Sequence, residues 1–146
     1  MLESFSIMAP LHIKGKKIPV PIIQGGMGVG VSLHPLARSV AQEGGVGIVS
    51  SACVDRLVSK RTGRNVNTYE AMYEEVSLSK ENGGYAGANI MVALVRDYES
   101  SVRGAIDAGA DMIISGAGLP LNLPGIQPPK DTALVPIVSS ARALDL

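Results

Sequence analysis

Aromatic residues make up only 3% of the 146-residue sequence, and tryptophan is absent. A core must therefore be built from aliphatic side chains, which is typical of a buried parallel sheet. Cysteine is scarce as well, because Cys53 is the only one. A single cysteine excludes an internal disulfide and favours a cytoplasmic location. We interpret Cys53 as a small buried residue and not as a nucleophile.

The chain also lacks an excess of either charge and any long apolar run. Lysine plus arginine and aspartate plus glutamate number 13 each, so we expect no nucleic-acid or membrane partner. No apolar stretch approaches the ~18 residues of a membrane-spanning helix, and the first residues lack the pattern of a secretory leader. His12 and His34 have no cysteine, histidine or carboxylate neighbours at ligand spacing, so we predict no metal site.

Segment 18–52 has the pattern of a βαβ unit. An apolar run over 20–23 predicts a first strand. Helical spacing over 33–41, after Ser32 as a good N-cap, predicts a helix. A second apolar run over 46–49 predicts the next strand. The carboxyl end of a strand carries the ligand site in α/β folds, so the loop between the first strand and the helix is the natural place to look for chemistry.

That loop reads QGGMGVG over 24–30. Its glycines allow a ligand to approach the backbone closely and leave N–H groups free to donate. The glycine spacing matches neither a dinucleotide fingerprint nor a P-loop. We predict that the backbone of Gly25, Gly26, Met27 and Gly28 lines a binding site at the carboxyl ends of the strands. A tight turn with no ligand is the equally weighted alternative.

Two further segments have a local pattern of their own. Residues 11–20 predict a small hairpin with Gly15 and Lys16 as a type II′ turn. The polar stretch 55–67 holds four basic residues. We interpret this stretch as a solvated surface loop, with an anion contact near the mouth of a site as the less favoured alternative.

The rest of the chain continues as alternating helices and strands. We predict a helix capped by Thr68, with Tyr69, Met72, Tyr73 and Val76 on its inner face, and another capped by Asp97. The Pro-rich stretch 117–132 fits no ordinary helix. Further strands are predicted over 85–92, 112–114 and 134–138, and a last helix from 139.

This alternation of helices and strands indicates an α/β fold, with residues 1–146 forming one domain and no second domain. Five strands joined by right-handed crossovers favour the first part of a (βα)8 barrel. A small doubly wound parallel sheet is the alternative. An open five-stranded sheet has bare edges, which favour self-association.

Two polar features of the later strands are candidates for chemistry. Asn89 lies within an apolar strand, where a buried amide is costly unless it is hydrogen-bonded. We predict that its side chain points to the same mouth as Met27 and away from the helices; a structural hydrogen bond to a loop is the alternative. Small residues over 115–118 and 139–140 leave room for a flat ligand, or serve ordinary turns.

Taken in order, five motifs resemble the nitronate monooxygenase family, formerly called 2-nitropropane dioxygenase, and its relative the flavin-dependent enoyl-acyl-carrier-protein reductase. The motifs are PIIQGGMGVGVS, AQEGGVGIVSSA, GANIMVAL, AGADMIISGAGLPLNLP and ALVPIVSSARAL. The resemblance extends over 11–144 and implies the N-terminal part of a (βα)8 barrel that holds non-covalent FMN.

The resemblance also assigns roles to residues. It implies that Gly25, Gly26, Met27 and Gly28 lie beside the flavin and that Asn89 hydrogen-bonds it. The family's catalytic histidine lies in a later segment resembling AGGH, beyond residue 146, so neither histidine of this chain takes that role. The loops that hold the FMN phosphate are expected in later segments too.

The activity implied is the oxidation of an alkyl nitronate by dioxygen to a carbonyl compound and nitrite, with FMN carrying the redox step. A flavin-dependent enoyl-acyl-carrier-protein reductase is the alternative within the flavin class. A non-catalytic half-barrel fragment is the alternative outside it. We expect residues 1–146 on their own to be inactive.

Overall fold

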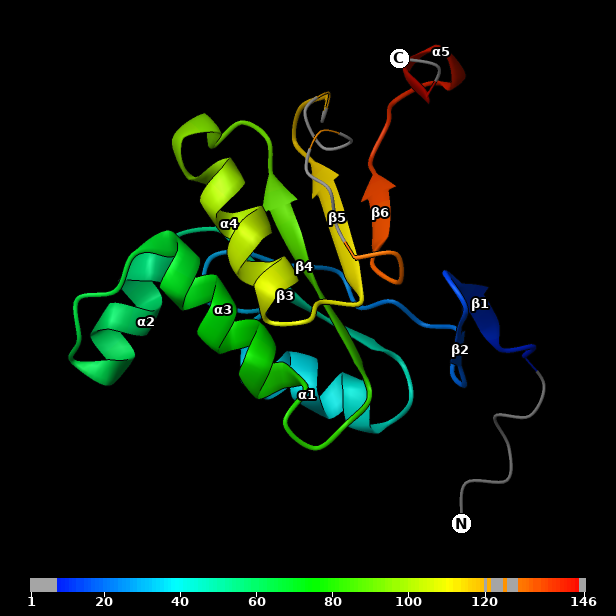
Figure 1. The fold of residues 1–146 in the computed structure, drawn as a ribbon, viewed down its shortest axis with the longest axis horizontal. Helices are drawn as coiled ribbons and strands as arrows, with labels where there is room; N and C mark the ends of the chain where they lie inside the picture. Colours follow the sequence, from blue (N-terminus) through cyan, green and yellow to red (C-terminus); the bar gives the residue numbers. More distant parts are fainter. Residues whose placement is uncertain (1–7, 120, 122–124, 126–128, 145–146) are drawn as a thin grey trace.

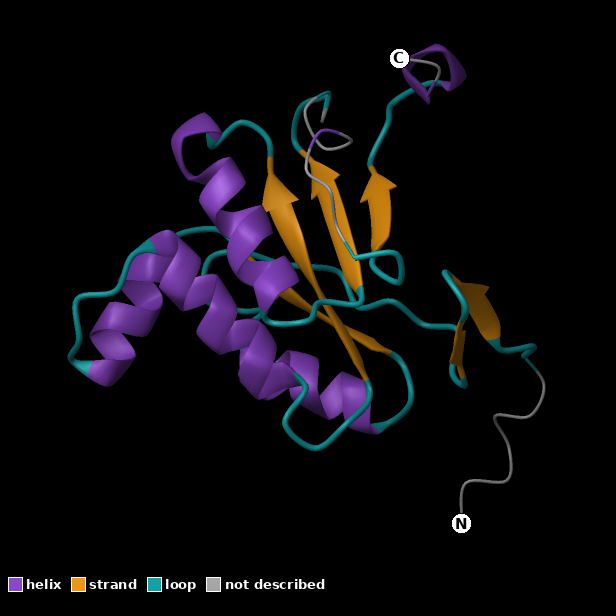
Figure 2. Cartoon of the chain, viewed as in Figure 1, coloured by secondary structure: helices purple, strands orange, loops and turns teal. Residues whose placement is uncertain are grey.

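The computed structural model describes residues 8–119, 121, 125 and 129–144. It is an α/β structure around a parallel four-stranded sheet (Figure 2). The strands run in sequence order across the sheet: β3 (Val46–Ser50), β4 (Tyr85–Met91), β5 (Met112–Gly116) and β6 (Ala133–Pro136). The α/β class and the parallel sheet predicted from the sequence are therefore confirmed.

The strand predicted over 20–23 is reduced to a single rung. Ile23 forms an isolated parallel bridge with Val46 at the free edge of β3, and the chain then leaves the sheet. Before this bridge, the N–H of Ile22 donates to the carbonyl of Val20 at 2.7 Å in a tight local turn and not to β3, so the ladder does not continue towards the hairpin. The glycine loop therefore follows a single bridge to β3 and not a full strand.

Four helices lie on one face of the sheet (Figure 1). They are α1 (His34–Gln42), α2 (Val54–Thr62), α3 (Thr68–Ser79) and α4 (Val95–Asp107). A short fifth helix, α5 (Ala141–Leu144), follows β6. Buried side chains of the strands interlock with the helices in one core, which includes Val49, Ala88, Ile90, Ile113, Met72, Val76, Val102 and Ala105.

The amino-terminal hairpin covers part of the other face. Strands β1 (Leu11–Ile13) and β2 (Lys16–Ile18) are antiparallel, and their apolar side chains pack with Val46 and Ile48. The turn is Lys14-Gly15, with φ of 47° and 76°, so the predicted Gly15-Lys16 turn was wrong by one residue. Positive φ at both positions is typical of a type I′ turn, whose twist suits a hairpin.

A buried carboxylate anchors this hairpin to the amino ends of the strands. Asp111 Oδ2 accepts hydrogen bonds from Lys80 Nζ at 2.7 Å and from the N–H of Ala86 at 2.9 Å. Lys16 Nζ of the hairpin lies 3.3 Å from Asp111 Oδ1. The ion pairs therefore close the end of the sheet opposite the predicted ligand site.

The stretch 55–67 is mostly helix α2, so the prediction of a surface loop was wrong there. Val54 and Val58 stand one turn apart and are both fully buried, and this two-residue stripe is enough to dock a short polar helix. Arg61 and Arg64 pair with glutamates of α3. Those pairings remove the reason to expect an anion contact at these two arginines.

Helix ends and faces also differ in detail from the sequence analysis. Asn67, not Thr68, caps α3, in a capping box with Glu70. Met72 and Val76 are buried, but Tyr69 and Tyr73 are exposed. The buried face of α3 is therefore narrower than predicted and does not include the two tyrosines. Helix α4 begins at Val95, with Asp97 in its first turn and not at the cap. The centre of the Pro-rich stretch 117–132 lies outside the described residues.

Candidate functional site

The glycine loop crosses the carboxyl ends of β3 and β4. The carbonyl of Gly26 accepts a hydrogen bond from Asn89 Nδ2 at 3.1 Å. A Cβ added at Gly26 would lie 2.4 Å from Asn89 Cβ, and one at Gly28 would lie 2.6 Å from Ala52 Cβ. The structure thus brings together the two motifs, 63 residues apart, that the sequence analysis marked as ligand-binding.

These contacts change the reason for the glycines. The glycines were predicted to allow a ligand to approach, but at Gly26 and Gly28 the close neighbours are side chains of the protein itself. A Cβ at Gly25 would meet nothing within 4 Å. A larger residue at Gly26 would therefore disturb Asn89 whether or not a ligand binds.

Asn89 lies on the sheet face that the helices leave free. Its register partners are Ser50 on β3 and Ile114 on β5, whereas its chain neighbours Ala88 and Ile90 point into the helical core. Because a carbonyl oxygen only accepts, the contact with Gly26 fixes the amide so that Nδ2 donates. Oδ1 has no hydrogen-bond partner among the described residues and is an acceptor open to a ligand.

Ser32 belongs to this site and not to the helix, so its prediction as the N-cap of α1 was wrong. Leu33 occupies the cap position without a side-chain hydrogen bond. Ser32 is buried, and its Oγ accepts from the N–H of Met27 at 2.9 Å while donating to the carbonyl of Gly25 at 3.2 Å. It also accepts from Gln24 Nε2 at 2.8 Å. The hydroxyl therefore fixes the loop, and its one donor and two acceptor positions are all used within the protein.

The outward side of the loop is apolar. The exposed fractions of residues Met27, Val29 and Val31 are 62%, 60% and 58%. These exposed apolar side chains follow closely along the chain from Gly26, whose N–H makes no hydrogen bond within the described residues. Exposed apolar side chains near a free donor suit a flat, largely apolar ring with a polar edge.

The small residues at the end of β5 do not leave room for a ligand. The hydroxyls of Ser115 and Tyr98 are 2.8 Å apart in the helical core. A Cβ at Gly116 would lie 2.8 Å from Ile137 Cδ1, and one at Gly118 would lie 3.0 Å from Val92 Cβ. Close packing within the protein therefore accounts for these residues, and Ser140 serves the turn into α5 by accepting from the N–H of Ala143.

Cys53 is exposed, so its interpretation as a buried residue was wrong. It follows β3 with a φ of 55° and precedes the first residue of α2. The left-handed backbone turns the chain sharply from strand to helix, and this turn directs the side chain to solvent.

Sequence reasoning missed a buried carboxylate at the junction of three helices. Glu75 on α3 is fully buried and accepts from the backbone N–H of His34 at 2.6 Å. His34 Nδ1 lies 3.0 Å from the same carboxylate, and Arg61 donates to it from α2. Burial alone would lower the pKa of Arg61, but Glu75 and Glu74 raise it, so the guanidinium stays charged. The signal was present, because Met72, Glu75, Val76 and Ser79 share one helical stripe.

This cluster has a structural role in the described part of the chain. No group of three metal-ligating side chains comes together there, although His34 does have the carboxylate neighbour that spacing along the sequence could not reveal. The carboxylate lies at the amino end of α1, where negative charge is favourable. Glu75 thus supplies from α3 the cap that Leu33 lacks.

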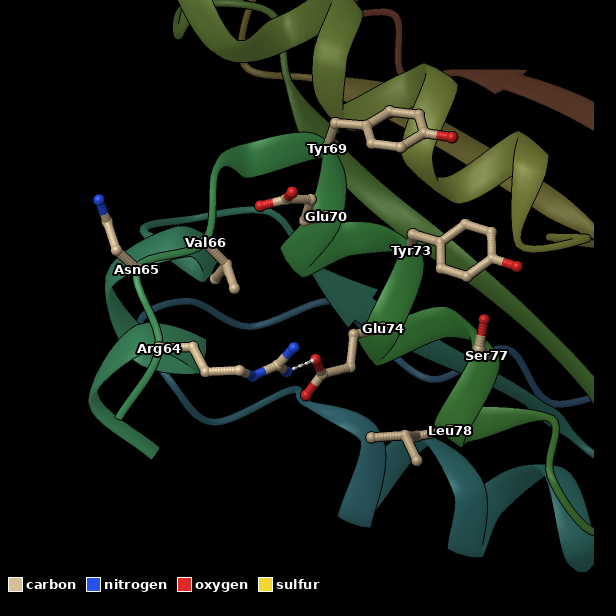
Figure 3. A pocket seen from close by; sticks show the side chains of 9 residues that line it. All are labelled: Arg64, Asn65, Val66, Tyr69, Glu70, Tyr73, Glu74, Ser77 and Leu78. Carbon is tan, nitrogen blue, oxygen red and sulfur yellow. Dashed lines mark hydrogen bonds and ion pairs between the residues drawn. The ribbon is translucent and has the colours of Figure 1, made fainter. Parts of the chain in front are cut away.

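An open pocket of about 740 Å³ lies on the outer side of α3 (Figure 3). Tyr69 and Tyr73 stack along it with ring centroids 6.4 Å apart, and Arg64 pairs with Glu74 at its opposite side. None of its lining residues is a predicted site residue. The pocket is therefore separate from the glycine loop.

Comparison with models of known protein families and with curated proteins gave no match. Within the described ranges, no helix combines the length and the hydropathy needed to cross a membrane.

Proposed function

We propose that the chain is the N-terminal part of an FMN-dependent oxidoreductase resembling nitronate monooxygenase, which oxidises alkyl nitronates with dioxygen to a carbonyl compound and nitrite. One observation carries the proposal. The glycine loop and Asn89, the two motifs to which the resemblance gives flavin contacts, meet through the Gly26–Asn89 hydrogen bond at the carboxyl ends of β3 and β4. We place the protein in the cytoplasm, as its single cysteine favours.

The arrangement of the sheet supports the barrel as its setting. Strands of a (βα)8 barrel follow one another in sequence order with helices on the outer face only, and β3 to β6 have that order and that one-sided cover. A doubly wound sheet instead reverses its strand order and carries helices on both faces. The free face, with Asn89 on it, would be the barrel interior.

The residues of the site fit the ring of FMN. Asn89 Oδ1 would accept from an N–H of the ring edge, and loop N–H groups would donate to its carbonyl oxygens and nitrogens. The exposed side chain of Met27 would lie against the apolar face of the ring. FMN, when bound, supplies the redox chemistry. The protein residues would bind and orient the ring and exclude water from its apolar face.

An assay of the complete protein separates the candidate activities. We expect nitrite release from an alkyl nitronate under air, with FMN recovered from the purified protein. NADH oxidation with an enoyl thioester, and no nitrite, would instead assign the enoyl-acyl-carrier-protein reductase activity. Absence of both activities together with absence of flavin absorbance would favour the non-catalytic alternative and reject the proposal.

Residues 1–146 alone are expected to behave differently. The catalytic histidine and phosphate loops that the resemblance implies lie in later segments, and among the described strands β6 pairs with β5 alone. Free edges of apolar strands invite pairing with other chains. We expect weak or no FMN binding, no nitronate turnover and self-association in sedimentation. A monodisperse, yellow and active monomer would contradict this prediction.

A further inference from the structure

We propose that Gln24 is a positioning residue whose side-chain amide replaces main-chain groups in the β-ladder, so that the N–H of Gly26 is left free for a ligand. The proposal concerns how the loop is held, and Gln24 itself need not touch the ligand. That the ligand is the FMN ring rests on the proposed function. The role of the amide in the ladder does not.

The ladder at the edge of β3 begins in the regular parallel way. The N–H of Val46 donates to the carbonyl of Ile22 at 2.9 Å, and the N–H of Gln24 donates to the carbonyl of Val46 at 3.0 Å. Parallel ladders repeat every two residues. The next rung would join the N–H of Ile48 to the carbonyl of Gln24, and the N–H of Gly26 to the carbonyl of Ile48.

The Gln24 side chain occupies that next rung. Its Oε1 accepts from the N–H of Ile48 at 3.0 Å, and its Nε2 lies 3.2 Å from the carbonyl of Ile48. The two partners fix the orientation of the amide, because an N–H can only donate and a carbonyl can only accept. The N–H and the carbonyl of Ile48 thus both have partners in the Gln24 side chain. The main chain can therefore leave the sheet at Gly25.

Ser32 then fixes the direction of the released chain. Gln24 Nε2 donates to Ser32 Oγ at 2.8 Å and lies 3.0 Å from the carbonyl of Gly25, to which Ser32 Oγ also donates. In a planar trans peptide the carbonyl and the next N–H point in opposite directions. Holding the carbonyl of Gly25 therefore turns the N–H of Gly26 away from Gln24 and Ser32.

The N–H of Gly26 makes no hydrogen bond within the described part of the chain. An outward N–H on a residue without a side chain can approach a hydrogen-bond acceptor on the edge of a flat ring. The ligand class that this geometry recognises is a heteroaromatic ring with a carbonyl oxygen or an unprotonated nitrogen at its edge.

The test is amide hydrogen exchange, followed by NMR, on residues 1–146 and on the Gln24→Val variant. In the unchanged chain we expect a slowly exchanging Ile48 and a rapidly exchanging Gly26. Valine cannot fill the rung, so the main chain should re-join the ladder and slow exchange at Gly26 about tenfold. Gln42→Val, at the exposed end of α1, is the matched control and should leave Gly26 unchanged.

The results have distinct meanings. A protected Gly26 in the unchanged chain, or an unprotected Gly26 beside a still-protected Ile48 in Gln24→Val, would overturn the proposal. If Gln24→Val does not fold, Gln24→Glu replaces it: the carboxylate keeps the acceptor for Ile48 but loses the donor, and protection of Gly26 should again rise.

A titration with FMN to millimolar concentration tests the ligand separately. This titration uses the complete protein, in which later segments are expected to complete the FMN site. We expect the Gly26 amide resonance to shift in the unchanged protein and in Gln42→Val, and to stay in place in Gln24→Val. Free exchange at Gly26 without any FMN-dependent shift would remove FMN as the ligand of this chain while leaving the positioning role of Gln24 intact.

Discussion

Replacing Glu75 with alanine is expected to lower the free energy of unfolding by about 3–5 kcal/mol, the usual cost of removing one partner from a buried ion pair. The carboxylate is fully buried and lies between three helices. It accepts from the N–H of His34 on α1 and from Arg61 on α2. Alanine would leave the N–H of His34 without an acceptor and Arg61 with Glu74 alone, so the loss includes desolvation of the N–H as well as the lost attraction.

Urea unfolding measures this loss, and the neighbouring residue provides the control. Glu74 also pairs with Arg61, at 2.7 Å, but a quarter of its side chain is exposed. Glu74→Ala should therefore cost less than about 1 kcal/mol. Equal losses for Glu74→Ala and Glu75→Ala would mean that burial of the carboxylate does not matter, and would contradict the prediction.

The pH dependence of the control follows from its pKa. Partial burial alone would raise the pKa of Glu74, but hydrogen bonds and attraction from Arg61 and Arg64 outweigh burial and lower it. A lowered folded-state pKa stabilises the protein above the pKa of the unfolded chain, and the stabilisation is lost as pH falls through the folded-state value. The difference between the unchanged chain and Glu74→Gln should accordingly vanish in acid.

Local patterns in the sequence were sufficient for the elements of the core. Runs of apolar residues located β3, β4, β5 and β6 to within about two residues of their observed ends. Apolar residues at helical spacing located α1, α3 and α4, because burial of one stripe determines where a helix can dock. The meeting of the glycine loop with the end of β4 also followed, since parallel strands deliver their carboxyl ends to the same edge.

Contacts between distant residues were not accessible in the same way. Glu75 and His34 are 41 residues apart, and Gln24 and Ile48 are 24 apart. The local pattern does not predict that the side chain of Gln24 replaces a peptide group in the ladder. Nor does it predict that Glu75 caps another helix. Helix α2 was not predicted because most of its residues are polar or charged, and only Val54 and Val58 form its buried face.

Gly47→Ala is expected to lower the free energy of unfolding by about 3 kcal/mol, at the upper end of ordinary overpacking. Gly47 is the second residue of β3 and faces Ala37 of α1. An added Cβ would lie 1.8 Å from the carbonyl oxygen of Ala37 and 2.8 Å from Ala37 Cα. These atoms belong to the helix backbone, so no side-chain rotation can relieve the contact, and α1 must move away from the strand.

That movement should reach the glycine loop, because the N–H of Ser50 on β3 donates to the carbonyl of Ser32 just before α1. Gly47→Ala should therefore speed amide exchange at Ser50 and Met27 as well as lower the unfolding midpoint in urea. Gly25→Ala is the matched control, since a Cβ there meets nothing within 4 Å, and it should change the free energy of unfolding by less than about 0.5 kcal/mol. Similar stabilities for the two alanine variants would show that α1 does not approach β3 this closely, and the close contact of Ala37 with Gly47 would then not be what fixes the position of Ser32.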